Sequence, residues 1–483
     1  MKKITLFLAL IFLTSVFAFT GCINSKNTAT HYDIEVTFAD NILNGKQTLT
    51  YYNDTETALT ELKFNLFANA FRKDAKFSPV GAQHTAQSYY NGVSYGDMAI
   101  NAVKSGNQDV EFSVGGQDMN ILTVKLGTEV YPEESVQVFI DFTVTLANVV
   151  ARTGINKNTI NLANFYPILC ARDDNGFYEC VYYSTGDPFY SDCANYKVTF
   201  TGNENLIVAS SGKTVSVEDE GGLKTHVFEI ENARSFALVL SEKFETISYD
   251  CDGVEVLYYY YEDKNPQNSL DYAKKSLTYF ENTFGEYPYS TYSVVQTEFV
   301  QGGMEFPALV MISDDLEQSA YGEVIVHETA HQWWQTAVGN NEIEYGFLDE
   351  GLAEYSVVLF YENYPEYNLT RKALVQSAEQ TYKVFCSVSD KLFGKVNTVM
   401  LRSLKDFSSE YEYVNMAYIK PCIMYDTLRN TVGEEKFFKA LKRYYESYKF
   451  KNATPDDLVG VYEKIGADSN GFFKSFFNGT VII

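Results

Sequence analysis

The sequence predicts a two-domain protein in which an all-β domain is followed by an α+β domain. The chain has 483 residues, more than one ordinary hydrophobic core holds. Its hydrophobic period is two from residue 31 to about residue 245, as in half-buried strands, and becomes helical afterwards. With 46% hydrophobic and 21% charged residues, the composition is globular. We therefore expect a β domain at 31–245 and a second domain at 246–483.

The first 22 residues have the features of an export signal. Two lysines precede an apolar run from Ile4 to Phe19, which is shorter than the roughly 20 residues of a spanning helix. The run ends in Thr20-Gly21-Cys22, which resembles a bacterial lipoprotein signal that is cleaved before the cysteine and lipidated on it. Ordinary cleavage with a free Cys22 is the alternative. Residues 23–30 are polar and predict a tether. We expect an extracytoplasmic protein, anchored to a bacterial cell membrane through a lipid on Cys22 or secreted.

Charge and cysteine content exclude two classes of site. The net charge of −25 argues against nucleic acid as a partner, since phosphates would be repelled. No C-x-x-C pair exists, so the cysteines do not predict a zinc site. The sequence leaves open whether the six cysteines after Cys22 form disulfides or remain thiols; they are Cys170, Cys180, Cys193, Cys251, Cys386 and Cys422.

Alternating apolar residues predict the strands of the first domain. The first runs over residues 32–38, and Asn44-Gly45 predicts the turn of a hairpin whose second strand lies around residues 47–52. The clearest alternation runs from Val136 to Leu146. Further strands are expected at 62–66, 196–200 and 227–240.

The second domain opens with a strand at 254–261 and a helix that starts at Asn265-Pro266 and ends at Gly285. A strand-like stretch at 292–300 follows. The remainder is expected to be helical, and Thr454 is expected to cap one of the last helices.

Residues 327–331 read His-Glu-Thr-Ala-His and predict a metal site. Histidines four apart on a helix share one face, so both imidazoles can bind one ion. Glu328 points to the same pocket and can take a proton from the attacking water. Two surface histidines on an amphipathic helix are the alternative, but apolar neighbours at 324–326 and Ala330 favour a buried helix. Gly339 is expected to mark the stop after this helix.

A third ligand and a second motif complete a family signature. Eighteen residues separate His331 from Glu350, which lies in the first turn of a predicted helix. An H-E-x-x-H motif followed by 18 residues and then Glu is typical of gluzincins of the M1 aminopeptidase family. This sequence resembles that family. The segment Gly302-Gly303-Met304-Glu305-Phe306 is similar to its Gly-Ala-Met-Glu-Asn motif, with Phe306 in place of Asn. The segment 186–200 also resembles the β domain of bacterial members.

The resemblance implies a saddle-like N-terminal sheet domain and a thermolysin-like catalytic domain that binds one Zn²⁺ through His327, His331 and Glu350. It implies that Glu328 is the general base. The implied substrate-binding residues are Gly302, Gly303, Met304 and Glu305, of which Glu305 holds the peptide's amine. Glu354, one turn after Glu350, either orients His327 or is an exposed helix carboxylate. No role is assigned to Asp349.

A tyrosine is expected to stabilise the oxyanion. The family has a Tyr-x-Lys-Gly segment, which Tyr418-Ile419-Lys420-Pro421 resembles, 68 residues after Glu350. Pro421 replaces the Gly of that pattern, so the sequence does not fix the local backbone conformation. Proline is tolerated at a helix start. Tyr413 and Tyr411 are the alternative candidates.

The sequence thus indicates a monomeric zinc metallopeptidase that removes N-terminal residues from peptides. Since 133 residues follow Glu350, we expect no helical domain over the active site and a cleft that is open on that side. An endopeptidase with the same zinc centre is one alternative. A peptide-binding lipoprotein is another, although a pure binder needs no general base.

Overall fold

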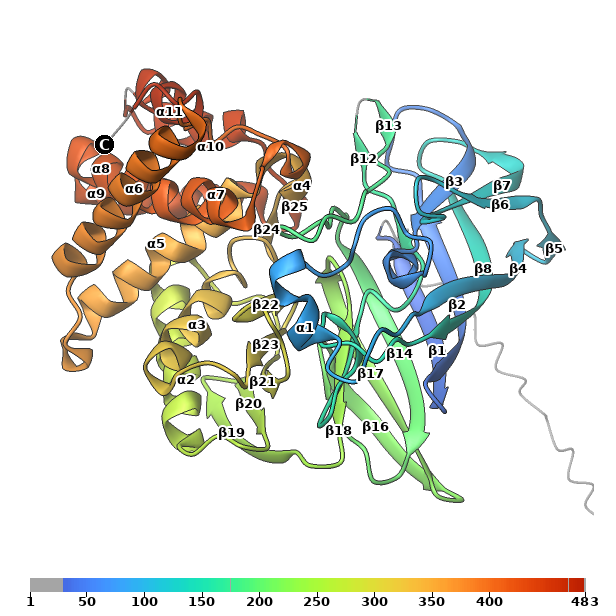
Figure 1. Cartoon of the computed structure of the whole chain (residues 1–483). Coiled ribbons are helices and arrows are strands. Elements are labelled where there is room, and N and C mark those ends of the chain that lie inside the picture. The colour runs from blue at the N-terminus through green and yellow to red at the C-terminus, as the bar shows by residue number, and fades with distance from the viewer. Residues whose placement is uncertain (1–28, 174, 468, 482–483) are drawn as a thin grey trace, which may run out of the picture.

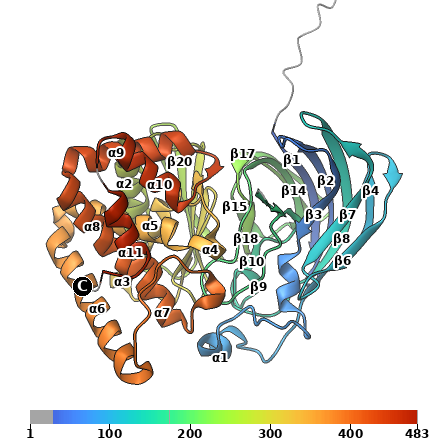
Figure 2. The ribbon, with the colours of Figure 1, turned by 90° about the horizontal axis from the view of Figure 1, so that it is seen from above.

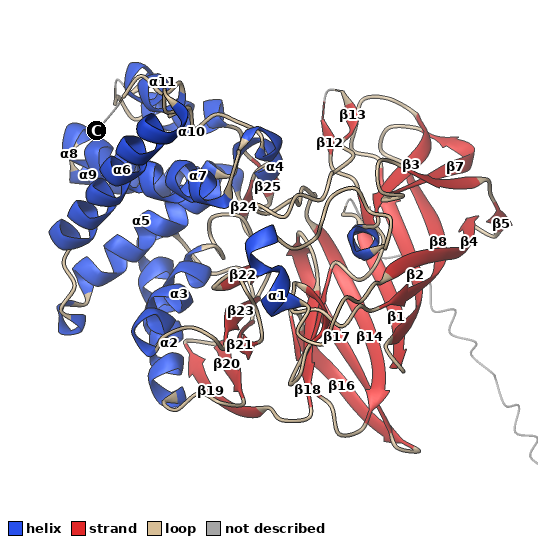
Figure 3. Cartoon of the chain, viewed as in Figure 1, coloured by secondary structure: helices blue, strands red, loops and turns tan. Residues whose placement is uncertain are grey.

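The computed structural model describes residues 29–173, 175–467 and 469–481. The predicted signal segment, including Cys22, lies outside them. A strand-rich half and a mainly helical half lie side by side (Figures 1 and 3), and the view from above shows the same division (Figure 2). The predicted succession of an all-β region and an α+β region is confirmed. None of the described helices combines the length and apolar character that a membrane crossing requires.

The largest sheet of the first half has eight strands in the order β16-β17-β14-β1-β2-β8-β4-β5. Strand β1 pairs in parallel with β14 and antiparallel with β2. Tyr32, Ile34 and Val36 alternate with more exposed residues along β1, as the pattern predicts. The strands are β1 (His31–Ala39), β2 (Ile42–Tyr52), β4 (Asp97–Ser105), β5 (Gln108–Asp109), β8 (Ser135–Thr145), β14 (Ala194–Asn203), β16 (Lys213–Glu220) and β17 (Leu223–Ala233).

Two four-stranded sheets and one short pair complete this half. Their orders are β15-β18-β10-β9, β11-β3-β7-β6 and β12-β13. The strands are β3 (Leu59–Asn65), β6 (Phe112–Gly115), β7 (Ile121–Val130), β9 (Thr153–Ile155), β10 (Ile160–Ala163), β11 (Ile168–Leu169), β12 (Arg172–Asp173), β13 (Gly176–Phe177), β15 (Ile207–Ser210) and β18 (Ala237–Ser241).

The predicted position of the first hairpin turn is wrong. The turn lies at Asp40-Asn41, whose φ angles are 50° and 65°, and Asn44-Gly45 lies inside β2. A Cβ on Gly45 would come within 2.2 Å of the Phe142 ring, so this glycine makes room for a neighbouring side chain. The strand predicted at 227–240 is also two strands, β17 and β18, which belong to different sheets.

The second half contains a five-stranded sheet in the order β19-β20-β21-β23-β22. It begins with β19 at Glu245, beside the boundary expected at 245/246. Strand β22 forms one edge of the sheet and pairs only with β23. The strands are β19 (Glu245–Cys251), β20 (Val254–Tyr260), β21 (Thr291–Thr297), β22 (Gly303–Phe306) and β23 (Leu309–Ser313), and a further pair is β24 (Val338–Gly339) with β25 (Lys451–Asn452).

Helices account for most of the remaining chain. Helix α2 begins at Pro266 and ends at Phe284, and Thr454 forms a capping box with Asp457 at the start of α10, as predicted. The helices of this half are α2 (Pro266–Phe284), α3 (Gln318–Ala330), α4 (Glu342–Tyr345), α5 (Phe347–Asn363), α6 (Arg371–Phe393), α7 (Glu410–Val414), the π-helix η5 (Asn415–Ile419), α8 (Lys420–Val432), α9 (Glu434–Tyr448), α10 (Pro455–Lys464) and α11 (Asn470–Phe477); the short turns η3 (Pro365–Tyr367) and η4 (Leu404–Asp406) lie between them. The first half adds η1 (Phe67–Phe71), η2 (Ala82–His84) and α1 (Thr85–Ser88).

The helix that carries the histidines ends earlier than Gly339. Helix α3 ends at Ala330, and Gly339 lies in β24. The chain can leave the helix because Arg234 of the first half is buried here and donates from Nε to the Gln335 carbonyl at 2.7 Å and from a terminal nitrogen to the Ala337 carbonyl at 3.5 Å. A side chain remote in sequence therefore satisfies carbonyl groups that a longer helix would have used.

Hydrogen bonds across the interface hold the two halves in a fixed relation. The Glu298 carboxylate accepts from the backbone and side chain of Asn158, at 2.9 and 2.7 Å, and from the Thr159 hydroxyl at 2.8 Å.

Within the described chain the six cysteines are all free, which settles the question that the sequence left open.

Candidate active site

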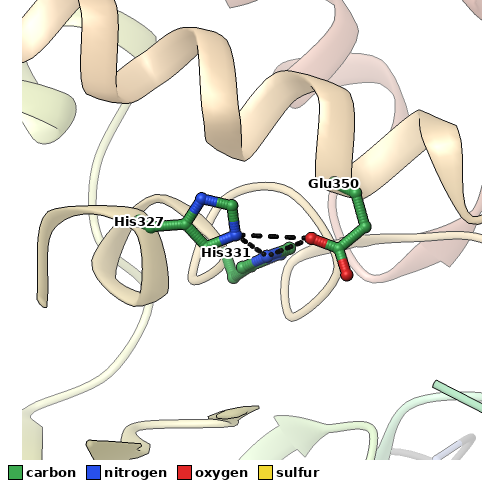
Figure 4. Close-up of side chains that lie close together, drawn as sticks. All are labelled: His327, His331 and Glu350. Carbon is green, nitrogen blue, oxygen red and sulfur yellow. Dashed lines mark hydrogen bonds and ion pairs between the residues drawn. The ribbon is translucent and has the colours of Figure 1, made fainter. Parts of the chain in front are cut away.

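Helices α3 and α5 bring the three predicted metal ligands together (Figure 4). His327 and His331 lie one turn apart at the end of α3, and Glu350 lies in the first turn of α5. His327 Nε2 and His331 Nε2 are 3.1 Å apart, and they lie 3.3 and 3.2 Å from Glu350 Oε2. A tetrahedral zinc ion about 2.0–2.1 Å from each ligand would set these atoms roughly 3.3 Å apart. The geometry fits Zn²⁺.

Outer partners fix the orientation of both imidazoles. His331 Nδ1 lies 2.9 Å from the Trp334 carbonyl, and His327 Nδ1 lies 3.3 Å from Glu354 Oε2. When each Nδ1 donates to its partner, the lone pairs of both Nε2 atoms face one another and Glu350, an arrangement that needs a cation at its centre. Of the two roles that the sequence allowed Glu354, this contact corresponds to orienting His327.

Protonation is the alternative way to neutralise this cluster. Burial by itself would lower the pKa of His327, but the hydrogen bonds with Glu350 and Glu354 outweigh it and raise the pKa to about 10. A metal ion must therefore displace protons from the histidines when it binds, so metal affinity falls as the pH is lowered.

Glu328 lies beside the metal ligands and is packed against the glycine of the edge strand. Its side chain is buried, and Oε2 has no hydrogen-bond partner among the described residues. A Cβ on Gly303 would lie 2.2 Å from Glu328 Oε1, so only glycine permits this approach. Burial raises the pKa of the Glu328 carboxyl to about 7, and a nearby cation would lower it again. The group is suited to accept and return a proton near neutral pH.

Glu305 is a buried carboxylate on the edge strand β22. It is 4% exposed, and its Oε1 has no partner in the described part of the chain. Glu305, Glu328 and His331 each offer an atom within 4.8 Å of the others. Burial raises the pKa of Glu305. An unpartnered buried carboxylate is costly unless a cation joins it, so the site is suited to receive one.

Two neighbouring carboxylates were not predicted as parts of the site. Glu342 accepts from Gln335 Nε2 at 2.9 Å, and Asp349 accepts from Asn340 Nδ2 at 3.0 Å. Both lie within 4.8 Å of Glu305. Their positions in the sequence, in and beside helix starts, gave no signal, because acidic residues are common there.

A π-helical turn places Tyr418 over the metal ligands. Tyr418 lies in η5, its hydroxyl donates to Glu350 Oε1, and its ring stacks on that of His327 with centroids 5.8 Å apart. Tyr413 packs edge-on against Tyr418, because the wider π turn brings residues five apart toward one face. Tyr411 is 48% exposed. Pro421 follows at the second position of α8, where it is tolerated.

The cavity next to these residues measures about 490 Å³ and is lined by both halves. Arg152 from the first half is buried, is ion-paired with Asp187, and places Nε 3.1 Å from Met304 Sδ. It was not predicted, since a single arginine in a strand-rich region carries no signal. At the mouth, His84 Nε2 lies 3.4 Å from Glu410 Oε2.

The three ligands and the neighbouring Glu328 form a candidate zinc site. Residues 268–477 match the model of the peptidase family M1 domain.

The chain is also similar to curated aminopeptidases. The chain is 27% identical over 292 residues to aminopeptidase M1-B of Oryza sativa subsp. japonica, covering 56% of this chain and 32% of the relative. It is 28% identical over 275 residues to human endoplasmic reticulum aminopeptidase 2, covering 53% and 28%. The chain therefore spans about a third of the length of these relatives.

Solved structures show the same fold over nearly the whole chain. The M1 zinc metallopeptidase of Deinococcus radiodurans matches with a TM-score of 0.68 at 17% identity, covering 94% of this chain and 95% of that one. A form of the same enzyme bound to a Tyr-Ser-Ala substrate matches with a TM-score of 0.67.

The contact between Glu354 and His327 predicts a specific effect on metal affinity. Purified protein should contain about one Zn²⁺ per chain, and Glu354→Gln should weaken zinc binding roughly 10-fold, because outer partners of ligating histidines typically contribute that much. Competition with a chromogenic chelator measures it. Glu446→Gln, an exposed carboxylate on α9, is the matched control. Equal zinc affinity in both variants would contradict the role given to Glu354.

Proposed function

We propose that the protein is a zinc-dependent aminopeptidase that removes N-terminal residues from peptides. The observation that carries the proposal is the buried carboxylate of Glu305 beside the metal ligands, whose Oε1 has no hydrogen-bond partner among the residues that the structure describes. A peptide's free amine is cationic near neutral pH and is the partner that this carboxylate lacks. The names of the relatives, and the peptide bound to the Deinococcus enzyme, support a peptide substrate.

The chain's own residues supply binding and proton transfer. The edge of β22 is free to pair with an extended peptide, and Gly303 lets that peptide approach Glu328. With its amine on Glu305, only the first peptide bond reaches the reacting centre. Glu328 accepts the proton of the attacking water and returns it to the leaving amine, while the Tyr418 hydroxyl donates to the developing oxyanion. Zinc, when bound, polarises the carbonyl and makes the water more acidic.

Mutation can distinguish the roles of Tyr418 and Tyr413. Tyr418→Phe should keep zinc and lose roughly 10²-fold or more in kcat, because one oxyanion donor is removed. Glu328→Gln should also keep zinc and lose at least ~10²-fold. Hydrolysis of aminoacyl reporter substrates and zinc analysis measure both. Near wild-type activity of Tyr418→Phe, together with an inactive Tyr413→Phe, would transfer the role to Tyr413.

Blocking the substrate's amine tests the proposal against the endopeptidase alternative. Acetylating the N-terminus of a peptide should lower kcat/KM ~10-fold or more, since the charge that pairs with Glu305 is lost. Glu305→Ala should cause a similar loss for free peptides only. Mass spectrometry of the products identifies the bond cut. Internal cleavage of acetylated peptides, as fast as the trimming of free ones, would make the protein an endopeptidase.

We also propose that the protein is exported and held at a bacterial cell membrane by a lipid on Cys22. The basic start, short apolar run and Gly21-Cys22 support this. Cys22→Ala should move the protein from the membrane fraction to the soluble fraction, or stall its processing, as immunoblotting of fractionated cells shows. An unchanged membrane fraction with normal processing would rule out the lipid anchor.

A further inference from the structure

We propose that the active site selects a positively charged side chain, Lys or Arg, at the second residue of the peptide, and that Glu323 is the residue that recognises it. This inference rests on the proposed aminopeptidase function and adds a substrate class to it. It follows from the direction in which a peptide must lie and from the partners of the cavity's carboxylates.

The packing of β22 against α3 fixes the direction of the peptide. Glu305 lies near His331 and Glu328, and Gly303 lies against Glu328. Further along, a Cβ on Gly302 would lie 3.9 Å from Val324 Cγ2. A peptide whose amine is at Glu305 therefore presents its first bond at Glu328. Its second residue continues past Gly302, toward the start of α3.

Glu323 lies at this downstream end of the cavity. It precedes Val324 on α3 and lies one helical turn before His327, so it shares the face that carries the ligands. Ala320 and Val324 line the cavity beside it. Both are small or aliphatic, so neither offers a charge to a substrate side chain, whereas the Glu323 carboxylate does.

Every other carboxylate of the cavity already has a partner or a role. Of the seven that line it, Glu305, Glu328 and Glu350 serve the amine, the proton and the metal. Asp187 pairs with Arg152, Glu354 contacts His327, and Glu410 contacts His84. The half-buried Glu323 makes no hydrogen bond or ion pair with any residue that the structure describes. Its charge is therefore free to pair with the substrate.

The local charge strengthens this preference. Glu354, which interacts electrostatically with Glu323, is also acidic. Among the described lining residues no lysine is present, and the one arginine, Arg152, is already paired with Asp187. Lysine and arginine can extend an apolar stem along Val324 and place their charge at Glu323. A half-buried ion pair of this kind contributes up to about 1 kcal/mol, which corresponds to a preference of up to about 5-fold.

The test compares two peptides that differ only at the second residue, Ala-Lys-Ala-Tyr and Ala-Gln-Ala-Tyr. For the wild-type zinc enzyme at low salt, the initial rate of alanine release should give a kcat/KM that is roughly 2- to 5-fold higher for the lysine peptide. Glu323→Gln should bring this ratio to about 1, and salt should reduce it in the wild type, because an exposed charge interaction is screened. Glu317→Gln, an exposed carboxylate at the start of the same helix, should keep the wild-type ratio.

Binding provides a readout that does not depend on turnover. In the Glu328→Gln background, calorimetry should show tighter binding of the lysine peptide, and adding Glu323→Gln should remove the difference. A wild-type ratio near 1, or a ratio that survives Glu323→Gln, would overturn the proposal. If neither peptide is trimmed, the aminopeptidase function fails, whereas the calorimetric comparison still decides whether Glu323 recognises the charge.

Discussion

The active site depends on one electrostatic constraint, which is that buried carboxylates and two imidazole lone pairs converge where only cations can join them. His327, His331 and Glu350 hold three ligand atoms 3.1–3.3 Å apart, and Glu305 lies beside them with an oxygen that no described residue contacts by a hydrogen bond. Burial makes each of these groups costly until it is neutralised. One cation is the metal, and we propose that the second is the amine of the substrate. In both cases a cation neutralises a buried, negatively charged group.

Local backbone features position the groups that meet this need. The end of α3 at Ala330 and the start of α5 at Phe347 place the three ligands on adjoining helix ends. The π turn of η5 carries Tyr418 onto Glu350. Gly303 lets the edge strand lie directly against Glu328. Each of these is a departure from regular structure, and such departures occur often at functional sites.

The first half of the molecule contributes residues to the active-site cavity. Arg152 and Asp187 line the cavity, and Arg234 binds the carbonyl groups of the segment that follows α3. In the second half, Glu298 accepts hydrogen bonds from Asn158 and Thr159 of the first half. The chemistry of the second half therefore depends on contacts with residues that lie more than a hundred positions away in the sequence.

The sequence by itself predicted the metal ligands, Glu328 and Tyr418 and determined the order of the two domains, because helical spacing and strand alternation are local properties that a short motif can display. It misplaced the turn near Asn44 and the end of α3, since Phe142 and Arg234, which decide these features, are distant in the sequence. Only the tertiary structure brought Glu342, Asp349 and Arg152 to the site and left Glu323 without a partner in the described part of the chain. Whether a carboxylate is paired depends on what folds against it, and no local pattern records that.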